Sequence, residues 1–395
     1  MSEKERKRLG AMEQVKCGAI TIGEAAEILG LSYRQARRVH KRFVHGGVSG
    51  LIHAGCGKEG NKRIKDGSSE KALELYELCL QGYGPTLAAE VLGEEFGVHV
   101  HRETLRRRLH ERSLIVPRCR ERKHRRRRRR RSCFGELVQI DGSFHHWFGP
   151  EAPACCLMVM VDDATGRTLC FFSEQETSEA AFRVYRKWVE RHGAPEALYA
   201  DRKNVYVVQR EATESERAAG CGAQSDFGRA CWRLGTRIIQ AHSPQGKGRV
   251  ERMNGLLQDR LVKELARKSI RTIDAANAMI DGFTERLAEK FAVAPASDVD
   301  RHRKGPTKAV LDEALCWEEE RTVARDWTVS YKAIAYQIER QETTLRPGNR
   351  VSVRRYLSGG RIAIFYGGER LRFHEFRRRV ARAPTAEKGC GNAVL

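Results

Sequence analysis

Residues 241–265 read AHSPQGKGRVERMNGLLQDRLVKEL, and the rest of the chain is organised around this stretch. Apolar residues recur in it at intervals of three and four, which predicts a helix with one face packed against a core. They are Val250, Met253, Leu257, Leu261 and Leu265. The opposite face carries Lys247, Glu251, Asn254 and Gln258. Taken alone, the same pattern also describes an ordinary solvated amphipathic helix.

Two aspartates upstream each follow an apolar run that predicts a buried strand. Asp141 closes the run 136–140 and Asp201 closes the run 197–200, so we expect both carboxylates where a strand meets its loop. Mg²⁺ prefers hard oxygen ligands, including one or two protein carboxylates. With Glu251 on its helix, these residues fit a site where two divalent ions promote phosphoryl transfer. Carboxylates this close repel one another, so the site should be poorly ordered without divalent cations.

Five segments resemble, in order, the catalytic core of DDE transposases and retroviral integrases, with the closest likeness to ISNCY-type transposases of bacterial insertion sequences. They read QIDGSFHHWF, VDDATGR, LYADRKNVY, DFGRACWRLG and HSPQGKGRVERMNGLLQDRLVKEL. The likeness covers residues 135–295 closely. It implies a ribonuclease H-like fold in which Asp141, Asp201 and Glu251 are the catalytic and metal-binding residues, holding two Mg²⁺ or Mn²⁺ ions.

The sequence departs from the integrase pattern in two places. Arg202-Lys203-Asn204 stands where integrases usually have Asn-Gly after the second aspartate. The spacing from Asp201 to Glu251 is also longer, which implies an insertion around residues 204–224. Neither departure removes an expected metal ligand.

Four polar residues near the expected site have competing interpretations. Asp162 and Asp163 precede Ala-Thr-Gly, and a turn between two strands explains them, so they are left outside the triad. His145 and His146 adjoin Trp147-Phe148 and are expected to pack or to face DNA rather than to bind metal.

Three residues flank Glu251 on the turn and helix that carry it. We expect Lys247 and Arg249 to contact DNA, near the scissile phosphate or beside it. Asn254 lies one turn beyond Glu251 and either steadies the site or is a surface amide.

Composition narrows the class of partner. The chain has 395 residues and a formal net charge of +22, which indicates a polyanion partner because each neutralised phosphate releases counterions. No apolar run approaches the roughly 20 residues that cross a bilayer, and MSEKERKRLG is not an apolar leader. We therefore expect no membrane partner and a cytoplasmic, nucleoid-associated bacterial protein. Twelve cysteines without a CxxC pair argue against zinc ribbons and disulfide scaffolds.

The amino-terminal third predicts two all-α DNA-binding domains, 1–54 and 68–117. Residues 19–44 predict a helix-turn-helix with a turn at Gly30 and a cap at Ser32, although an ordinary basic helical hairpin is the alternative. Its second helix would present Arg34, Gln35, Arg37, Arg38 and Lys41 to a groove. The second domain would have helices near 70–80, 86–96 and 102–114, the last presenting Arg106 and Arg107.

Residues 118–133 form an Arg-rich linker that we expect to be disordered until it meets an anion. Arg125, Arg128 and Arg131 would then contact the DNA backbone, the alternative being a merely solvated linker. The α/β core is expected at 134–300, a small β-barrel at 320–377 and a disordered tail at 378–395. Within the core we expect, in order, strands at 136–140, 155–161 and 168–173, a helix at 178–192, a strand at 197–200, a helix at 226–235, a strand at 236–240 and the helix that carries Glu251.

The resulting hypothesis is a multidomain transposase. It would bind the terminal inverted repeats of an insertion sequence, free their 3′-hydroxyl ends and join them to target DNA. Joining two ends implies a homo-oligomer on DNA. Two alternatives remain: a catalytically silent transposase-derived regulator, and a structure-specific nuclease of the same fold.

Overall fold

The computed structural model describes residues 1–53, 56, 67–116, 128–208, 210–218, 220–241 and 247–376. The chain divides into two compact units, Met1–Glu121 and Arg122–Leu395. The predictions for Arg125 and for the tail 378–395 lie outside the described residues. In the described part, no helix is both long and apolar enough to cross a membrane.

The first unit begins with three helices, α1 (Glu3–Lys16), α2 (Ile22–Leu29) and α3 (Tyr33–Gly46), and a short 3₁₀ turn, Gly47–Leu51. The predicted turn and cap are confirmed. Gly30 has a left-handed backbone, and the Ser32 side chain accepts from the Gln35 backbone N–H, closing a capping box. Helix α1 was not predicted from the sequence, and it supplies Met12 to the small core around Val39.

Three further helices complete the first unit, close to the predicted positions: α4 (Ser68–Cys79), α5 (Pro85–Phe96) and α6 (Arg102–Glu111). Pro85 occupies the first turn of α5, where its missing N–H has no helical partner to lose. Their core is built around Leu73, Tyr76, Leu92 and Leu105.

The second unit is built on a five-stranded sheet with the strand order β4-β3-β2-β5-β6. Its strands are β2 (Val138–His145), β3 (Cys155–Asp162), β4 (Thr168–Ser173), β5 (Ala197–Ala200) and β6 (Arg237–Gln240). Strands β2, β3 and β4 are antiparallel neighbours, whereas β5 runs parallel to β2 and to β6. The order of strands and helices is the one predicted for the core.

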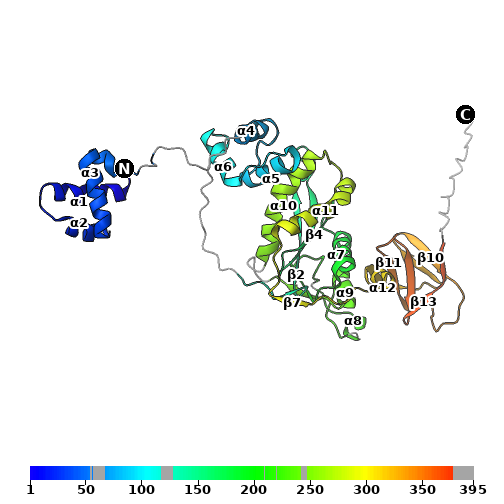
Figure 1. The fold of residues 1–395 in the computed structure, drawn as a ribbon. Coiled ribbons are helices and arrows are strands. Elements are labelled where there is room, and N and C mark those ends of the chain that lie inside the picture. Colours follow the sequence, from blue (N-terminus) through cyan, green and yellow to red (C-terminus); the bar gives the residue numbers. More distant parts are fainter. Residues whose placement is uncertain are drawn as a thin grey trace, which may run out of the picture. The chain divides into compact units, whose positions relative to one another are not determined.

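Helices cover both faces of this sheet (Figure 1). Helices α7 (Ser178–His192) and α9 (Asp226–Arg233) share one core with Cys156, Met158 and Met160 of β3. Helices α10 (Gly248–Arg267) and α11 (Ile273–Phe291) share the other, which contains the alternate β3 residues Leu157 and Val159. Strand β3 is therefore buried on both sides, as period-two alternation requires at the centre of a layered fold.

Three smaller elements lie around the core. The expected insertion contains a short helix, α8 (Glu214–Ala218). Strands β1 (Cys133–Phe134) and β7 (Ser297–Asp300) pair in parallel as a separate two-stranded sheet. Helix α12 (Lys308–Ala314) precedes the carboxy-terminal strands.

The predicted carboxy-terminal barrel is not confirmed, because its strands form two separate small sheets. They are β8 (Cys316–Thr322), β9 (Thr328–Tyr331), β10 (Ile334–Ile338), β11 (Arg350–Tyr356), β12 (Ile362–Tyr366), β13 (Glu369–Leu371) and β14 (Phe373–Phe376). The sheet orders are β13-β12-β11-β8 and β14-β10-β9. No described strand pairs across the two sheets, so no barrel closes.

Candidate active site

Strand register brings the two predicted aspartates level with each other. Parallel strands β2 and β5 pair Val138 with Leu198 and Gln139 with Tyr199. Two residues further along lie Asp141, still within β2, and Asp201, the first residue after β5, so strand alternation places both on the same face. Strand β2 continues to His145, so Asp141 lies within its strand and not at its end as predicted. The reason is the pairing of residues 141–145 with β3, which holds this polar segment in the sheet.

One ammonium group lies between these two carboxylates. The Nζ atom of Lys247 is 2.8 Å from Oδ1 of Asp141 and 3.4 Å from Oδ2 of Asp201. The Lys247 side chain is only 11% exposed. The expected repulsion between the carboxylates is therefore relieved by a cation that belongs to the chain itself.

Helix α10 is joined to β2 by a ladder of side-chain hydrogen bonds. The Val250 N–H donates to Oε1 of Gln139 (3.1 Å), and Nδ2 of Asn254 donates to Oδ2 of Asp141 (3.2 Å). Nε2 of Gln258 donates to the Ser143 hydroxyl oxygen (3.2 Å). Four helical residues advance about 6 Å and two strand residues about 6.6 Å, so successive turns of α10 match alternate residues of β2.

Glu251 lies on this helix one turn before Asn254, but its side chain is exposed. Among the described residues, no group of three His, Cys, Asp or Glu side chains is arranged to hold a metal ion. The structure thus brings Asp141 and Asp201 together and places Glu251 on a neighbouring turn, without assembling the three. The amide of Asn254 contacts Asp141 and is not simply a surface group.

The groups that surround the aspartates suit a hard cation. They are carboxylate oxygens, and Oδ1 of Asn254 is a buried acceptor without a hydrogen-bond partner. Such an orphaned oxygen is costly unless a water or another donor satisfies it. A cationic group already fits between Asp141 and Asp201. The donor set therefore fits a divalent ion with bound water.

A second cluster beside the aspartates escaped the sequence analysis. Glu176 is 5% exposed and accepts from Nζ of Lys203 (2.5 Å) and from the hydroxyl of Tyr206 (3.0 Å). Nζ of Lys203 is also 3.9 Å from Oδ2 of Asp201. A Cβ atom on Gly142 would lie 2.5 Å from Oε2 of Glu176, so this close approach requires glycine. No periodicity marks these residues, because three separate segments supply them.

Burial and nearby charges shift two pKa values in this cluster. Burial lowers the pKa of Lys203, but its hydrogen bond to Glu176 and the charges of Glu176, Asp201 and Asp141 outweigh burial and raise it overall. Burial, followed by the Glu176 charge, raises the pKa of Tyr206 well above its ordinary value. Lys203 therefore remains a cation and Tyr206 a neutral hydrogen-bond donor.

Asp162 and Asp163 do more than the predicted turn requires. Asp162 does fix the turn, accepting from the Thr165 N–H (2.6 Å) and hydroxyl (2.7 Å). Asp163 has a fully buried side chain and is surrounded by donors. Its partners are the Arg128 guanidinium, the Arg131 N–H (2.8 Å), Nε2 of Gln139 (3.1 Å) and Nε of Arg249 (2.8 Å).

The contacts of Asp163 change the interpretation of the Arg-rich linker. We expected the linker to be disordered until it meets an anion, but its described end, residues 128–131, packs on the core. The reason is that the buried carboxylate of Asp163 must be compensated by hydrogen-bond donors and positive charge, which Arg128 and Arg131 supply. Arg249, which was expected to contact DNA, pairs with the same carboxylate, and its side chain is only 16% exposed. Arg131 also pairs with Glu136 (3.3 Å) and remains largely exposed.

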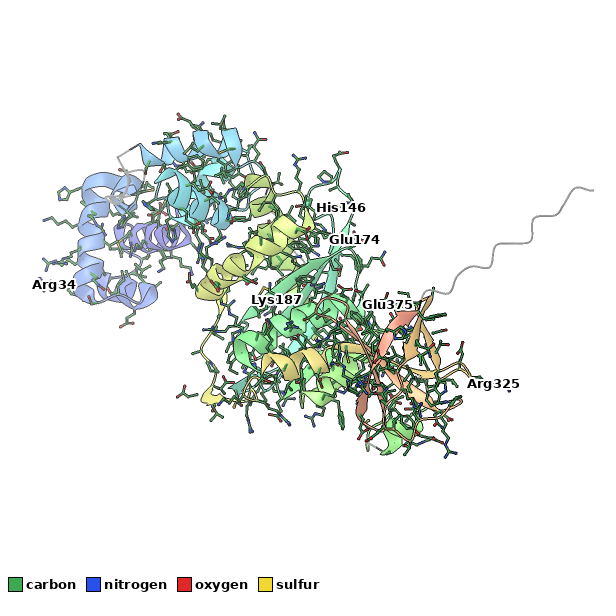
Figure 2. All side chains as sticks on the ribbon, turned by 90° about the vertical axis from the view of Figure 1, so that its right-hand side faces the viewer. Arg34, His146, Glu174, Lys187, Arg325 and Glu375 are labelled. Carbon is green, nitrogen blue, oxygen red and sulfur yellow. The ribbon has the colours of Figure 1, made fainter. Side chains whose placement is uncertain are left out.

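The remaining residues predicted to contact DNA are on helix surfaces of the first unit. Arg34, Gln35, Arg37, Arg38 and Lys41 are all exposed on α3, and Arg34 projects outward in Figure 2. Arg106 pairs with Glu103 (2.6 Å) and Arg107 with Glu111 (3.8 Å) along α6. These are exposed pairs of small energy, which a phosphate can replace.

Of the two histidines expected to pack or to face DNA, His145 packs against a neighbouring ring, whereas His146 is exposed. The ring of His145 lies edge-on to Trp147 at 5.3 Å between centroids. Nδ1 of His146 is 2.8 Å from the Ala152 carbonyl oxygen.

Known proteins resemble this chain over most of its length. The family of homeodomain-like domains matches residues 2–52. The protein described as "Putative transposase y4bF" of Sinorhizobium fredii (strain NBRC 101917 / NGR234) is 37% identical over 380 residues, which cover 95% of this chain and 82% of the relative. The "Transposase for insertion sequence IS1202" of Streptococcus pneumoniae is 29% identical over 323 residues, covering 73% and 68%.

Solved structures give weaker likenesses. The HTLV-2 integrase catalytic core domain in complex with magnesium, in its dimeric form, covers 39% of this chain and 87% of its own, with 19% identity and a TM-score of 0.30. The simian T-cell lymphotropic virus intasome in complex with PP2A regulatory subunit B56 gamma covers 72% and 91%, with 17% identity and a TM-score of 0.34. At these TM-scores the structural likeness carries no argument of its own.

The match to y4bF spans nearly the whole chain and most of the relative, and the homeodomain-like match falls on the observed helix-turn-helix. The chain belongs to the transposase family represented by y4bF.

Proposed function

We propose that this transposase cleaves and joins DNA at a site formed by Asp141, Asp201 and Glu251. The observation that carries the proposal is that the carboxylates of Asp141, on β2, and Asp201, just after β5, share one cation, the ammonium of Lys247. Two carboxylates from different segments that converge on one positive charge are typical of a site that binds cations. In a chain of net charge +22, the substrate is a nucleic-acid phosphodiester.

The side chains of the proposed site would have different roles. Asp141 and Asp201 would hold Mg²⁺ or Mn²⁺, Asn254 would orient Asp141, and Glu251 would complete the ligand set from the exposed turn of α10. When bound, a pair of divalent ions stabilises the attacking and leaving oxygens of an in-line displacement. Water would first attack the phosphorus at each element end and break its bond to the 3′-oxygen, leaving a 3′-hydroxyl and a 5′-phosphate. That 3′-hydroxyl would then attack a target phosphorus and displace the 3′-oxygen of the target strand as a new 3′-hydroxyl.

The first unit would recognise the DNA ends. The exposed basic residues of α3 suit insertion into the major groove, and α6 offers a second basic helix for an adjacent part of a terminal inverted repeat. Target DNA is the second substrate. Two ends must be joined together, so the active species would be a homo-oligomer assembled on DNA.

The test is a cleavage and joining assay with the full chain, labelled element ends, plasmid and Mg²⁺. Asp141→Asn, Asp201→Asn and Glu251→Gln should each lower cleavage and joining at least about 100-fold, because each removes electrostatic stabilisation of the reaction. Binding to the ends should persist in all three. Glu174→Gln is the matched control, since Glu174, labelled in Figure 2, is an exposed carboxylate two residues before Glu176 in the chain, and the variant should react like the parent.

Each alternative predicts a different outcome. End binding without any cleavage by the parent protein would support a regulatory DNA-binding protein. Cleavage without joining would support a nuclease. Full activity in an Asp141→Asn or Asp201→Asn variant would contradict the proposed site.

A further inference from the structure

In the absence of a metal ion, the ammonium group of Lys247 neutralises part of the negative charge of Asp141 and Asp201. We infer that Lys247 is a built-in counter-ion: its ammonium holds Asp141 and Asp201 in place, and a divalent ion must displace it in order to bind. The inference rests on the proposed function, because it concerns the same two carboxylates.

Local helix energetics do not explain the position of Lys247. It is the residue that caps α10 at its amino end, and it makes no side-chain capping hydrogen bond. Lysine is a poor residue at such a position, and a cation at a helix amino terminus opposes the helix dipole. The favourable partners of the ammonium are Asp141 and Asp201, at 2.8 and 3.4 Å. The attraction of the ammonium to these two carboxylates offsets the unfavourable position of a lysine at the amino end of α10.

The neighbouring lysine does not perform the same task. Nζ of Lys203 is 3.9 Å from Asp201 but 2.5 Å from Glu176, which is almost fully buried. Lys203 is therefore the partner of Glu176, and Lys247 is the cation that spans both aspartates. Two carboxylates and one ammonium leave this group with a net negative charge, which still attracts a cation.

An ammonium and a divalent ion cannot share the space between the same two carboxylates. Mg²⁺ requires ligand oxygens at about 2.0–2.1 Å in octahedral geometry, whereas the ammonium already occupies the space beside those oxygens, at 2.8 Å from Asp141, to which it donates, and 3.4 Å from Asp201. Like charges at this separation also repel in a partly buried site. Binding is therefore an exchange of one cation for another, and the lysine weakens the apparent affinity for the ion.

The experiment measures Mn²⁺ binding to the full-length protein without DNA, by the electron paramagnetic resonance signal of free Mn²⁺. Lys247→Met should bind Mn²⁺ about tenfold more tightly than the parent, whereas a merely structural role for Lys247 predicts weaker binding. Lys247→Gln is the second variant, in case methionine disturbs folding. Lys247→Arg keeps the charge and should restore the parental affinity.

Lys263→Met is the matched control, because Lys263 pairs with Asp259 about four turns further along the same helix and not with Asp141 or Asp201. It should leave Mn²⁺ binding unchanged. Unchanged or weaker binding by both Lys247→Met and Lys247→Gln would overturn the exchange, while the proposed site would stand. If Mn²⁺ fails to bind the parent, or still binds after Asp141→Asn and Asp201→Asn are combined, the counter-ion and the proposed site both fall.

Discussion

At the level of single residues, the sequence predicts the acidic groups but not their partners. Asp141 and Asp201 follow apolar runs and can be found from pattern alone. Glu176 cannot, because Lys203 and Tyr206 reach it from a different segment and no spacing rule links them. The same holds for Asp163. Its sequence predicts only a turn, but its carboxylate is fully buried and pairs with Arg128 and Arg249.

Glu176→Gln should weaken the segment that carries Asp201. The change removes the carboxylate that holds Lys203 and Tyr206. We expect the free energy of unfolding to fall by about 1–2 kcal/mol, less than for a fully buried pair because the Lys203 side chain is 44% exposed. Urea unfolding measures the loss. The exposed Glu174→Gln should cost nothing, and equal stability of the two variants would show that the cluster does not support the loop.

At the level of helices and strands, periodicity predicts elements and long-range pairing decides their ends. The strand at 168–173, the helix at 178–192 and the strand at 197–200 have the predicted bounds. Strand β2 runs on through polar residues because β3 pairs with them. Helix α11 went unpredicted although Ala276, Ile280, Phe283 and Leu287 have helical spacing. The predicted barrel is not confirmed, because turns and strands in a sequence do not reveal which strands pair.

Strand β8 is attached to the core by an ion cluster with a predictable pH dependence. Burial alone would raise the pKa of Glu318, but the charge of Arg233, the Ser352 hydroxyl and the charge of Arg354 outweigh it and lower the pKa to about 2. The usual value is 4.5. The folded state therefore gains stability from the ionised group above about pH 4.5, and this gain is lost as the pH falls toward 2.

Glu318→Gln should remove that part of the pH dependence. The parent protein should lose thermal stability between pH 4.5 and 2 more steeply than the variant, whose amide does not titrate. At pH 7 the variant should be the less stable protein, since Arg233 loses its carboxylate partner. Scanning calorimetry across this pH range measures both effects. Parallel curves for the two proteins would contradict the assigned role of Glu318.

At the level of the whole molecule, charge and composition predict the class of partner well. The excess of basic residues, the helix-turn-helix and the α/β core all indicate a protein that acts on DNA, and the match to transposases agrees. What the sequence could not show is which charged side chains of the core pair with one another. Lys247 neutralises the paired aspartates, and Asp163 fastens the end of the Arg-rich linker to the first turn of α10.

That three distant acidic segments surround one metal site is tested most directly by iron-directed cleavage of the protein backbone. Fe²⁺ replaces Mg²⁺ in the full-length protein, and ascorbate with peroxide then generates hydroxyl radicals that cut the nearest peptide segments. We predict cuts close to Asp141, Asp201 and Glu251, all suppressed by excess Mg²⁺ and by the combined Asp141→Asn and Asp201→Asn changes. Cuts that avoid these segments, or that occur near Asp141 and Asp201 but never near Glu251, would contradict the proposed site.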